Sequence, residues 1–327
     1  MFPRSGLHLF KTGSTVLSII TLIILCPLAT LAQVAPGVLP LEMLISFLPH
    51  ILLASTIAAA TLIFLNQRLL MFALPIIFVT AAPFLLFYKY EAAKGPPCQE
   101  GDCLTVITAN IYNLPSAMEA LFQLAEQENA DIVAINEAVP SLSMERYADA
   151  FPAYAYGTHA TWKNLPKPAG DPLTLLSKNE FAFSDTVSSD GTGRRPYIIA
   201  DLDGAWSDTR IIATHALVPL SPSMINARNT LLQEASTALQ GQDTFIMMGD
   251  FNLTPWSPTF RRLPGKRAGD PRLSNTWPTF FPPLGLSIDH IMFDGDLELV
   301  EFKVLESVGS DHYPILARFR RPSADDD

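Results

Sequence analysis

One segment constrains the fold more than any other: the apolar run Thr244–Met248 leads directly into Gly249-Asp250-Phe251-Asn252. A short apolar run followed by Asp, Asn and Pro is typical of a buried strand that ends in a turn. Side chains two residues apart on an extended segment point the same way, so Asp250 and Asn252 are expected to face one space. A carboxylate there can accept a proton from water while the amide orients it. A plain turn without chemistry uses the same residue types.

Five further segments place a polar residue suited to metal binding or acid–base chemistry at one end of an apolar run. They are Asn110 after Leu104–Thr108, Asn136-Glu137 after Asp131–Ala134, His215 after Ile211-Ile212, Asp289-His290 within Ser287–Ile291, and Asp311-His312 within Gly309–Pro314. Enzymes built on sheets place their chemistry in the loops at strand ends. These residues are therefore predicted to meet at one edge of a sheet.

In order and spacing, the six segments resemble the endonuclease/exonuclease/phosphatase superfamily of metal-dependent phosphoesterases, over residues 103–320. The resemblance implies an α/β (α+β) four-layer sandwich, in which two stacked mixed β-sheets are flanked by helices. It also implies hydrolysis of a phosphate ester with Mg²⁺, or Mn²⁺ in its place, as cofactor. Asn136 departs from the pattern, because many nucleases of the group carry Gln there and sphingomyelinase-like members often carry Asn.

Side-chain chemistry and the resemblance together suggest a role for each residue. Glu137 is the main candidate ligand for Mg²⁺, which prefers carboxylate oxygens, and Asn110 would share that site. Asp311 would contribute to the metal region. Asp250 would orient or deprotonate the attacking water, and Asn252 would hold this water and a phosphoryl oxygen.

The histidines divide into two groups. His215 and His312 would donate hydrogen bonds to the phosphate oxygens that gain charge in the transition state. Asp289 would pair with His312, fix its tautomer and favour the imidazolium form. His159 and His290 are interpreted as structural residues satisfied by hydrogen bonds. Trp256 is interpreted either as a residue that stacks on a ligand or as a packing residue under the active loop.

The 327 residues allow about two domains. The hydrophobic fraction of 49% is high for a soluble enzyme, and the excess lies near the N-terminus. We expect a membrane region at residues 1–90 with about three transmembrane helices, a linker at 91–102, the catalytic domain at 103–320 and a disordered tail at 321–327.

Three apolar runs without Asp, Glu, Lys or Arg support the membrane region: Ser14–Ala35, Leu44–Leu65 and Leu69–Tyr88. Each is close to the ~20 residues that a bilayer requires. A buried helical bundle explains one such run better than three in series. A small-residue site before Gln33 also allows the first run to be a cleaved signal peptide.

Basic residues in short loops predict the orientation of these spans. Arg4, Lys11 and Arg68 place the N-terminus in the cytoplasm, whereas Lys89 and Lys94 favour the opposite arrangement. Three of these five basic residues thus favour a multi-pass protein of the cell membrane with an extracytoplasmic catalytic domain. Cys98 and Cys103 form either a disulfide of an oxidising compartment or a chance pair of thiols.

Many expected strands and few helices fit two stacked sheets. The expected strands are Leu104–Thr108, Asp131–Ile135, Leu173–Ser177, Phe181–Val187, Tyr197–Leu202, Arg210–Thr214, Thr244–Met248, Leu286–Phe293, Leu297–Leu305 and Ile315–Phe319, and the expected helices are Ser116–Glu128 and Met224–Leu239.

The net charge of −10 gives no broad basic surface of the kind that supplies non-specific nucleic-acid affinity, which disfavours a processive or sequence-tolerant DNA enzyme without excluding one. A local patch, Arg261-Arg262 with Lys266-Arg267, could follow a nucleic-acid backbone or hold a phospholipid headgroup.

The sequence thus predicts a membrane-anchored, Mg²⁺-dependent phosphoesterase that cleaves phosphodiesters, with the substrate unassigned. The alternatives are a nuclease acting on DNA or RNA and a lipid phosphodiesterase of the sphingomyelinase or phospholipase C type. The expected partners of this protein are the lipid bilayer and a phosphate-ester substrate, either a nucleic acid or a lipid headgroup. No protein partner is inferred. A retired phosphoesterase used only for binding is the alternative of another class, which loss of a metal or acid–base residue would signal.

Overall fold

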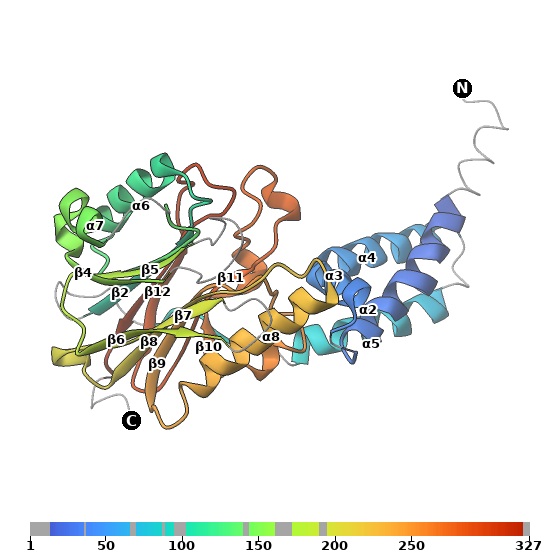
Figure 1. Ribbon diagram of the computed structural model, residues 1–327. Coiled ribbons are helices and arrows are strands. Elements are labelled where there is room, and N and C mark those ends of the chain that lie inside the picture. Colours follow the sequence, from blue (N-terminus) through green and yellow to red (C-terminus); the bar gives the residue numbers. More distant parts are fainter. Residues whose placement is uncertain are drawn as a thin grey trace. The chain divides into compact units, whose positions relative to one another are not determined.

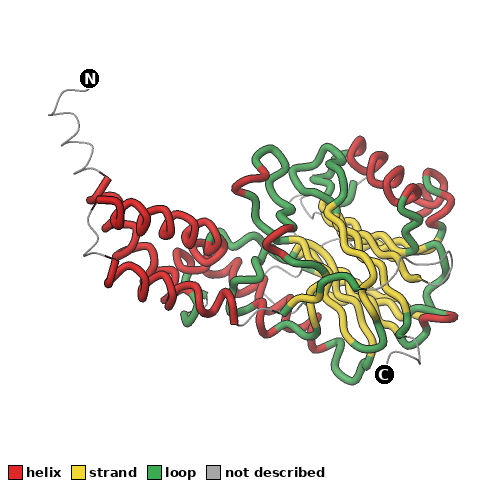
Figure 2. The backbone as a smooth tube through the Cα atoms, turned by 180° about the vertical axis from the view of Figure 1, so that it is seen from behind, coloured by secondary structure: helices red, strands yellow, loops and turns green. Residues whose placement is uncertain are grey.

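The structure is a computed structural model that describes residues 14–35, 37–65, 70–86, 89–94, 103–139, 144–160, 172–189 and 195–322. The chain forms two compact units (Figures 1 and 2). The helical unit contains Met1–Tyr88 and Pro255–Arg261, and the sheet unit contains Lys89–Thr254 and Arg262–Asp327. The expected tail lies outside the described residues from residue 323 onward.

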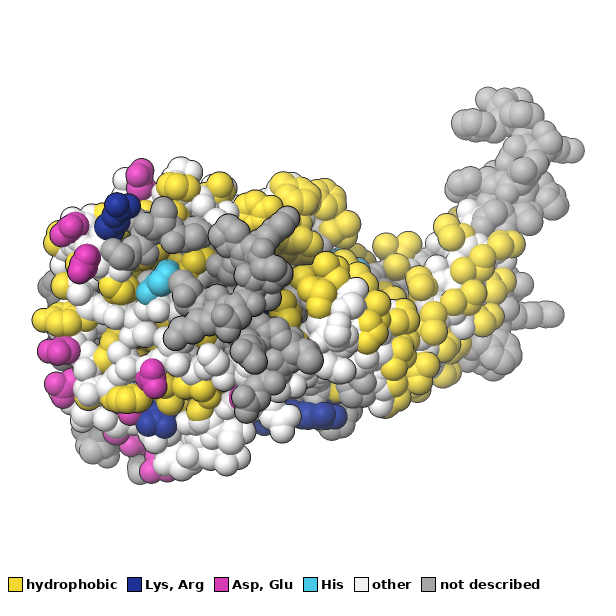
Figure 3. Space-filling model, in the orientation of Figure 1, with side chains coloured by type: hydrophobic (Ala, Val, Ile, Leu, Met, Phe, Trp, Pro, Cys, Tyr) yellow, Lys and Arg dark blue, Asp and Glu magenta, His cyan; other side chains and the backbone are white. Residues whose placement is uncertain are grey.

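The helical unit is built from the apolar runs. Its helices are the π-helical turn η1 (Thr21–Leu25), α2 (Cys26–Ala32), α3 (Leu39–Ser46), α4 (Leu48–Leu65) and α5 (Leu70–Leu86). Large hydrophobic side chains stay exposed on it, including Leu17, Ile23 and Phe64. Figure 3 shows hydrophobic side chains spread over the visible face of this unit. Water would be a poor solvent for such a surface.

The three expected spans are only partly supported. Ser14–Ala32 is helical over 19 residues with a mean hydropathy of 2.4, which is long and apolar enough to cross a bilayer or to serve as a signal sequence. The second run is divided into Leu39–Ser46 and Leu48–Leu62, which are bent by 72° and could form one broken span. The described residues therefore contain one candidate membrane span, or two if the bent helix pair is taken as a single span. Composition alone did not reveal this bend.

Trp256 is a packing residue in this structure. Its side chain is buried in the helical unit against Ala29, Ala32 and Ile45, which decides between its two interpretations. Ser257 Oγ donates to Glu42 Oε1 at 3.3 Å in the same unit.

The sheet unit consists of two stacked mixed sheets with flanking helices, as expected. The seven-stranded sheet has the order β1-β10-β11-β9-β8-β7-β6, and the six-stranded sheet has the order β12-β13-β2-β3-β5-β4. The strands are β1 (Tyr90–Glu91), β2 (Cys103–Asn110), β3 (Ile132–Asn136), β4 (Tyr156–Ala160), β5 (Leu173–Ser177), β6 (Phe183–Ser188), β7 (Pro196–Asp201), β8 (Thr209–His215), β9 (Thr244–Asp250), β10 (Lys266–Ala268), β11 (Asp289–Asp294), β12 (Glu298–Val304) and β13 (Ile315–Arg320).

Apolar side chains from both sheets form the central core, with Val106 and Ala317 on one side and Ile246 and Phe293 on the other. Helices α6 (Pro115–Gln127) and α7 (Met144–Ala150) cover the outer face of the six-stranded sheet, while α8 (Pro222–Thr237) lies on the outer face of the other (Figure 1). This arrangement is the predicted four-layer sandwich.

Cys103, at the start of β2, is disulfide-bonded, whereas Cys26 is a free thiol in the helical unit. Cys98 lies outside the described residues. The bonded state of Cys103 favours the disulfide over the chance pair of thiols.

Candidate active site

Strand register brings the predicted residues together. In the seven-stranded sheet, His215 on β8 and Asp289 on β11 both pair with Asp250 on β9, so three functional side chains stand side by side. In the six-stranded sheet, Asn110 on β2 pairs with Asn136 on β3. The two sheets meet at this edge, where Asn110 Nδ2 donates to Asp250 Oδ2 at 3.2 Å.

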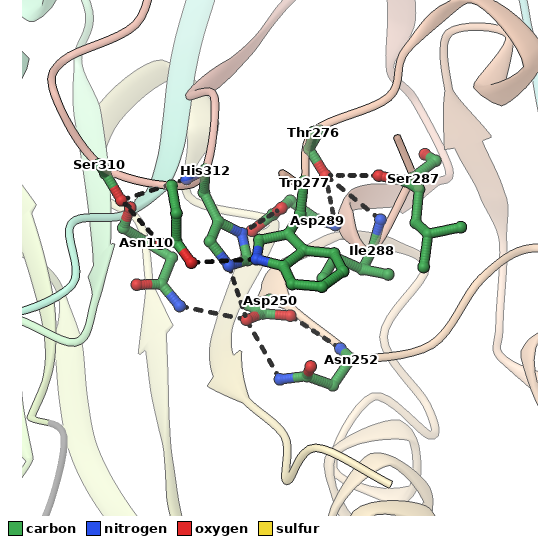
Figure 4. Close-up of polar contacts among 12 residues, drawn as sticks. Asn110, Asp250, Asn252, Thr276, Trp277, Ser287, Ile288, Asp289, Ser310 and His312 are labelled. Carbon is green, nitrogen blue, oxygen red and sulfur yellow. Dashed lines mark hydrogen bonds and ion pairs between the residues drawn. The ribbon is translucent and has the colours of Figure 1, made fainter. Parts of the chain in front are cut away.

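The Asp250–Asn252 turn is tightly held. Asn252 N donates to Asp250 Oδ1 at 2.8 Å, and Asn252 Nδ2 donates to Asp250 Oδ2 at 3.2 Å (Figure 4). Asn252 has φ +46°, a left-handed conformation that Asn tolerates better than most residues. Gly249 precedes the pair with φ +141°, where a Cβ atom would lie 1.8 Å from Thr214 O. Only glycine fits there, which explains the Gly-Asp order.

Asn110 and Glu137 meet as predicted. Asn110 Nδ2 donates to Glu137 Oε1 at 3.0 Å, and Asn110 Oδ1 accepts from Tyr112 N at 3.0 Å. The amide nitrogen of Asn110 therefore lies between the carboxylates of Glu137 and Asp250. Metal ligation through Oδ1 would require this amide to turn, so the ligand role of Asn110 remains a prediction.

Asp289 and His312 form the predicted pair. His312 Nδ1 lies 2.8 Å from Asp289 Oδ2, and His312 Nε2 points toward Asp250 Oδ2 at 4.0 Å (Figure 4). Burial alone would lower the pKa of His312. The negative charges of Asp289, Asp250 and Asp311 and the bond to Asp289 outweigh burial and raise this pKa to about 10. His312 is therefore a cation near neutral pH.

Asp250 has the electrostatics of a general base. Burial and the charge of Asp289 raise its pKa to about 7, although His312, Asn252 N and Asn110 oppose the rise. A carboxyl group that titrates near neutrality can be ionised and still be basic enough to take a proton from water.

His215 differs from His312. Burial and the positive charges of Arg195 and His312 hold its pKa well below the ordinary value, so it is neutral. Its Nε2 lies 3.7 Å from both Glu137 Oε1 and Asp250 Oδ2. A neutral imidazole can still donate one hydrogen bond to a phosphoryl oxygen.

Asp311 is turned toward an aromatic residue that sequence reasoning missed. Trp277 Nε1 donates to Asp311 Oδ2 at 3.0 Å, and the indole ring lies 6.5 Å from the His312 ring, centroid to centroid (Figure 4). Trp277 is 34 positions from Asp311, and nothing in its local sequence marks it as a site residue. The metal role of Asp311 remains a prediction.

Buried arginines hold the backbone of the site. Arg195 Nη1 donates to His215 O at 3.2 Å and to Ala216 O at 2.9 Å, and Arg228 Nη1 donates to Asn252 O at 3.1 Å. Sequence reasoning missed both, because an Arg in a helix or loop is usually solvent-exposed.

The donor set fits a hard divalent cation. Asp250, Asp289 and His312 offer ligand atoms within 4.8 Å of one another, and all three are buried. Among the described residues, Asp289 Oδ1 has no hydrogen-bond partner although it is buried. Protonated His312 supplies positive charge to this group and has no lone pair for a metal, so the ligands that the cluster offers are the carboxylates of Asp250 and Asp289. Carboxylate oxygens are what Mg²⁺ prefers, and Glu137 supplies one beside the cluster.

The predicted basic patch is wrong for one of its members and altered for another. Arg267 is fully buried, so it cannot contribute to a binding surface. Lys266 Nζ donates to Glu91 Oε2 at 2.8 Å. Burial therefore removes Arg267 from the predicted surface, whereas Lys266 stays exposed and is paired with Glu91.

A cavity of about 860 Å³ lies at the opposite end of the sheet unit. Its lining includes Thr105 near the start of β2, Asp131 directly before β3 and Ser177 at the end of β5, all remote from Asn110 and Glu137. It is therefore separate from the candidate active site.

Comparison with solved structures shows the same fold. An endonuclease/exonuclease/phosphatase from Beutenbergia cavernae aligns with TM-score 0.56 and 17% identity, covering 68% of this chain and 72% of that one. The human nocturnin catalytic domain with bound sulfate aligns with TM-score 0.55 and 15% identity, covering 68% and 95%. D. rerio TDP2 complexed with a single-strand DNA product aligns with TM-score 0.53 and 15% identity, covering 67% and 99%.

No curated protein matches the chain. A model of the endonuclease/exonuclease/phosphatase family does match it, over residues 107–312, which extend from β2 to His312 and include all the residues assembled above. The chain belongs to the Endonuclease/Exonuclease/phosphatase family.

Proposed function

We propose that this protein is a membrane-anchored, Mg²⁺-dependent phosphoesterase that cleaves phosphodiester bonds by in-line attack of water. Members of its family are hydrolases of phosphate esters and generally depend on a divalent metal. The observation that carries the proposal is the pairing of two buried groups: His312 Nε2 faces Asp250 Oδ2 at 4.0 Å while Asp289 holds His312 Nδ1 at 2.8 Å. Near neutral pH this pair offers a base and an acid within one site.

Asp250 acts on the water. Its Oδ2 accepts from Asn110 and Asn252, which fixes the direction of the carboxylate. The carboxylate takes the proton as water attacks phosphorus, and the Asn252 side chain stands beside it to orient water and a phosphoryl oxygen.

His312 and His215 stabilise the charge that develops on the phosphate. His312 contributes a positive charge and an Nε2–H that points into the site, while Asp289 holds its other nitrogen. His215 contributes a neutral Nε2–H from the adjacent strand. Donors fixed before the reaction stabilise the transition state without reorganisation.

Glu137 and Asn110 would hold Mg²⁺, with Asp311 contributing and Mn²⁺ as a substitute. The bound cation supplies charge stabilisation to phosphoryl and leaving-group oxygens. Glu137 has φ +49°, so its backbone is kept in a conformation that is costly for a side chain of this type. Such strain at a predicted ligand supports a functional role.

Glu137→Gln is expected to lower kcat/KM by about a hundredfold or more, because it removes the main anionic ligand of the cation. Activity is measured on the full-length protein with Mg²⁺, using bis(p-nitrophenyl) phosphate, plasmid DNA, RNA and sphingomyelin vesicles. Isothermal titration should show weaker Mg²⁺ binding, and thermal unfolding should be little changed.

Glu119→Gln on the exposed face of α6 is the matched control and should behave like the wild type. Full turnover of chelator-treated wild-type protein would sink the metal assignment. Inactivity of the wild type on every substrate would favour a retired binding domain.

The substrate panel also separates the alternatives. The solved TDP2 relative carries a single-strand DNA product, which supports a nuclease. Anchoring at a bilayer would raise the local concentration of lipid substrates, which supports a lipid phosphodiesterase. We place an unassigned phosphodiester first.

The helical unit is proposed to anchor the enzyme as a multi-pass region. Its support is the apolar helix Ser14–Ala32, the bent pair and the exposed hydrophobic side chains. With Leu69–Tyr88 as the third span, Arg4, Lys11 and Arg68 favour a catalytic domain outside the cytoplasm, and the disulfide-bonded Cys103 agrees with an oxidising compartment.

A reporter fused after Asp327 is therefore expected to be active only when it is of the periplasmic or extracellular type. Protease added to intact cells should digest the domain. Fusion of the same reporter to a cytoplasmic protein is the control. A cytoplasmic signal from the Asp327 fusion would mean that Lys89 and Lys94 determine the orientation.

A further inference from the structure

Arg267 is a completely buried cation in β10 that uses all its donors. Its Nε donates to His290 Nδ1 at 2.9 Å. The other four bonds go to Ala268 O at 2.9 Å, Gly269 O at 2.7 Å, Ser274 Oγ at 3.0 Å and Ser287 Oγ at 2.9 Å. Five donors with five acceptors fix the guanidinium in one orientation.

His290 continues this network toward the catalytic turn. Because Arg267 can only donate, His290 Nδ1 must accept, and the ring proton lies on Nε2. Nε2 donates to Leu253 O at 2.8 Å. Burial and the charge of Arg267 hold the pKa of His290 well below its ordinary value, so this tautomer persists.

Leu253 O is a sensitive point of the catalytic turn. The preceding residue, Asn252, is left-handed, and its carbonyl oxygen is held by Arg228. With the carbonyl of Leu253 also fixed, two successive peptide planes after Asp250 cannot rotate freely. The same turn carries the Asn252 amide, whose Nδ2 donates to Ala216 O at 3.0 Å and to Asp250 Oδ2 at 3.2 Å.

The same guanidinium reaches the other half of the site. Ser287, which accepts from Arg267, stands two residues before Asp289, the partner of His312. His290 directly follows Asp289, and both are on β11. One network therefore joins the Asp250–Asn252 turn to the strand that carries the Asp289–His312 pair.

We propose that Arg267 and His290 are positioning residues that set the Asp250–Asn252 turn against the Asp289–His312 pair. The inference rests on the proposed phosphoesterase function. Neither residue touches the substrate. Sequence reasoning treated His290 as merely structural and Arg267 as a surface cation, and the network gives both a role in catalytic geometry.

Two substitutions of His290 separate its two bonds. His290→Asn keeps an acceptor near the position of Nδ1, for Arg267, but has no donor for Leu253 O. His290→Gln keeps a donor near the position of Nε2, for Leu253 O. The Asn variant is expected to lose about a hundredfold in kcat on bis(p-nitrophenyl) phosphate with little change in KM, and the Gln variant about threefold.

Amide hydrogen exchange of the full-length protein provides a readout that does not need activity. Exchange across Asp250–Thr254 is expected to be at least about tenfold faster in the Asn variant and within about twofold of the wild type in the Gln variant. The matched control is His159, a half-buried histidine whose Nδ1 lies 2.7 Å from Thr174 Oγ1. His159→Asn and His159→Gln should leave kcat and this exchange unchanged.

Equal losses of kcat in the two His290 variants, in proportion to their lower melting temperatures, would show a purely structural role and overturn the proposal. Unchanged exchange across Asp250–Thr254 in the Asn variant would overturn it as well. An inactive wild type would contradict the phosphoesterase function, and the exchange comparison would then decide the positioning role alone.

Discussion

Asp250→Asn is expected to lower kcat on bis(p-nitrophenyl) phosphate by about 10³- to 10⁴-fold, with KM changed less than about threefold. Asp250 is 1% exposed, and its Oδ2 accepts from the amides of Asn110 and Asn252. An Asn at this position keeps the shape but removes the group that takes the proton. The phosphate contacts through His215 and His312 remain, so binding should survive.

The pH profile of the wild type checks the same assignment. Asp250 must be ionised to act as base, so kcat/KM should fall as the pH drops below its pKa of about 7. His312 must be protonated, so kcat/KM should fall again above its pKa of about 10. The residual activity of Asp250→Asn should lack the acidic limb.

Asp294→Asn at the exposed end of β11 is the matched control and should keep both limbs. Melting temperatures of both variants show whether each is folded. Full wild-type activity at pH 5 would exclude Asp250 as the base, whatever the effect of its substitution.

The strands that the sequence predicted include all those with uninterrupted apolar runs. Leu173–Ser177 forms a strand over the predicted residues, and Thr244–Met248 continues to Asp250, because such runs are buried on both faces between a second sheet and a helix. Because these runs are buried, the polar residues at their ends could also be predicted as functional positions. A polar residue directly after a buried run has to lie at the sheet edge.

The elements that the sequence missed have no such signal. Lys266–Ala268 carries two cations and Tyr156–Ala160 is partly polar, yet both pair with neighbouring strands through backbone bonds. A backbone ladder is independent of side-chain polarity. Backbone pairing with the neighbouring strands β11 and β5 determines that these two segments are strands.

Site electrostatics also depended on the tertiary structure. The sequence predicted that Asp289 holds His312, since the pairing is implied by the family resemblance. It could not predict that Asp250 titrates near 7, because burial and the distance to Asp289 cause that shift. The role of Arg267 was hidden for a similar reason: beyond its own neighbours, its acceptors come from three distant positions, Ser274, Ser287 and His290, the last of them on β11.

Asp289→Asn and His312→Ala are each expected to lower kcat/KM by about 10³-fold, and the double variant should be little worse than either single one. His312 is cationic only because negative charges, chiefly that of Asp289 at 2.8 Å, overcome its burial. Without Asp289, the imidazole loses both its charge and its fixed orientation. Without His312, Asp289 has no ring left to hold.

The measurement is kcat/KM for the wild type, the two single variants and the double variant at one pH between 7 and 10, the range in which Asp250 is ionised and His312 protonated. Independent action would multiply the two losses to about 10⁶-fold, whereas one functional unit loses its contribution only once. Thermal unfolding of each variant controls for the buried Asp289 left without its partner. Losses that multiply in folded variants would show that Asp289 and His312 act separately.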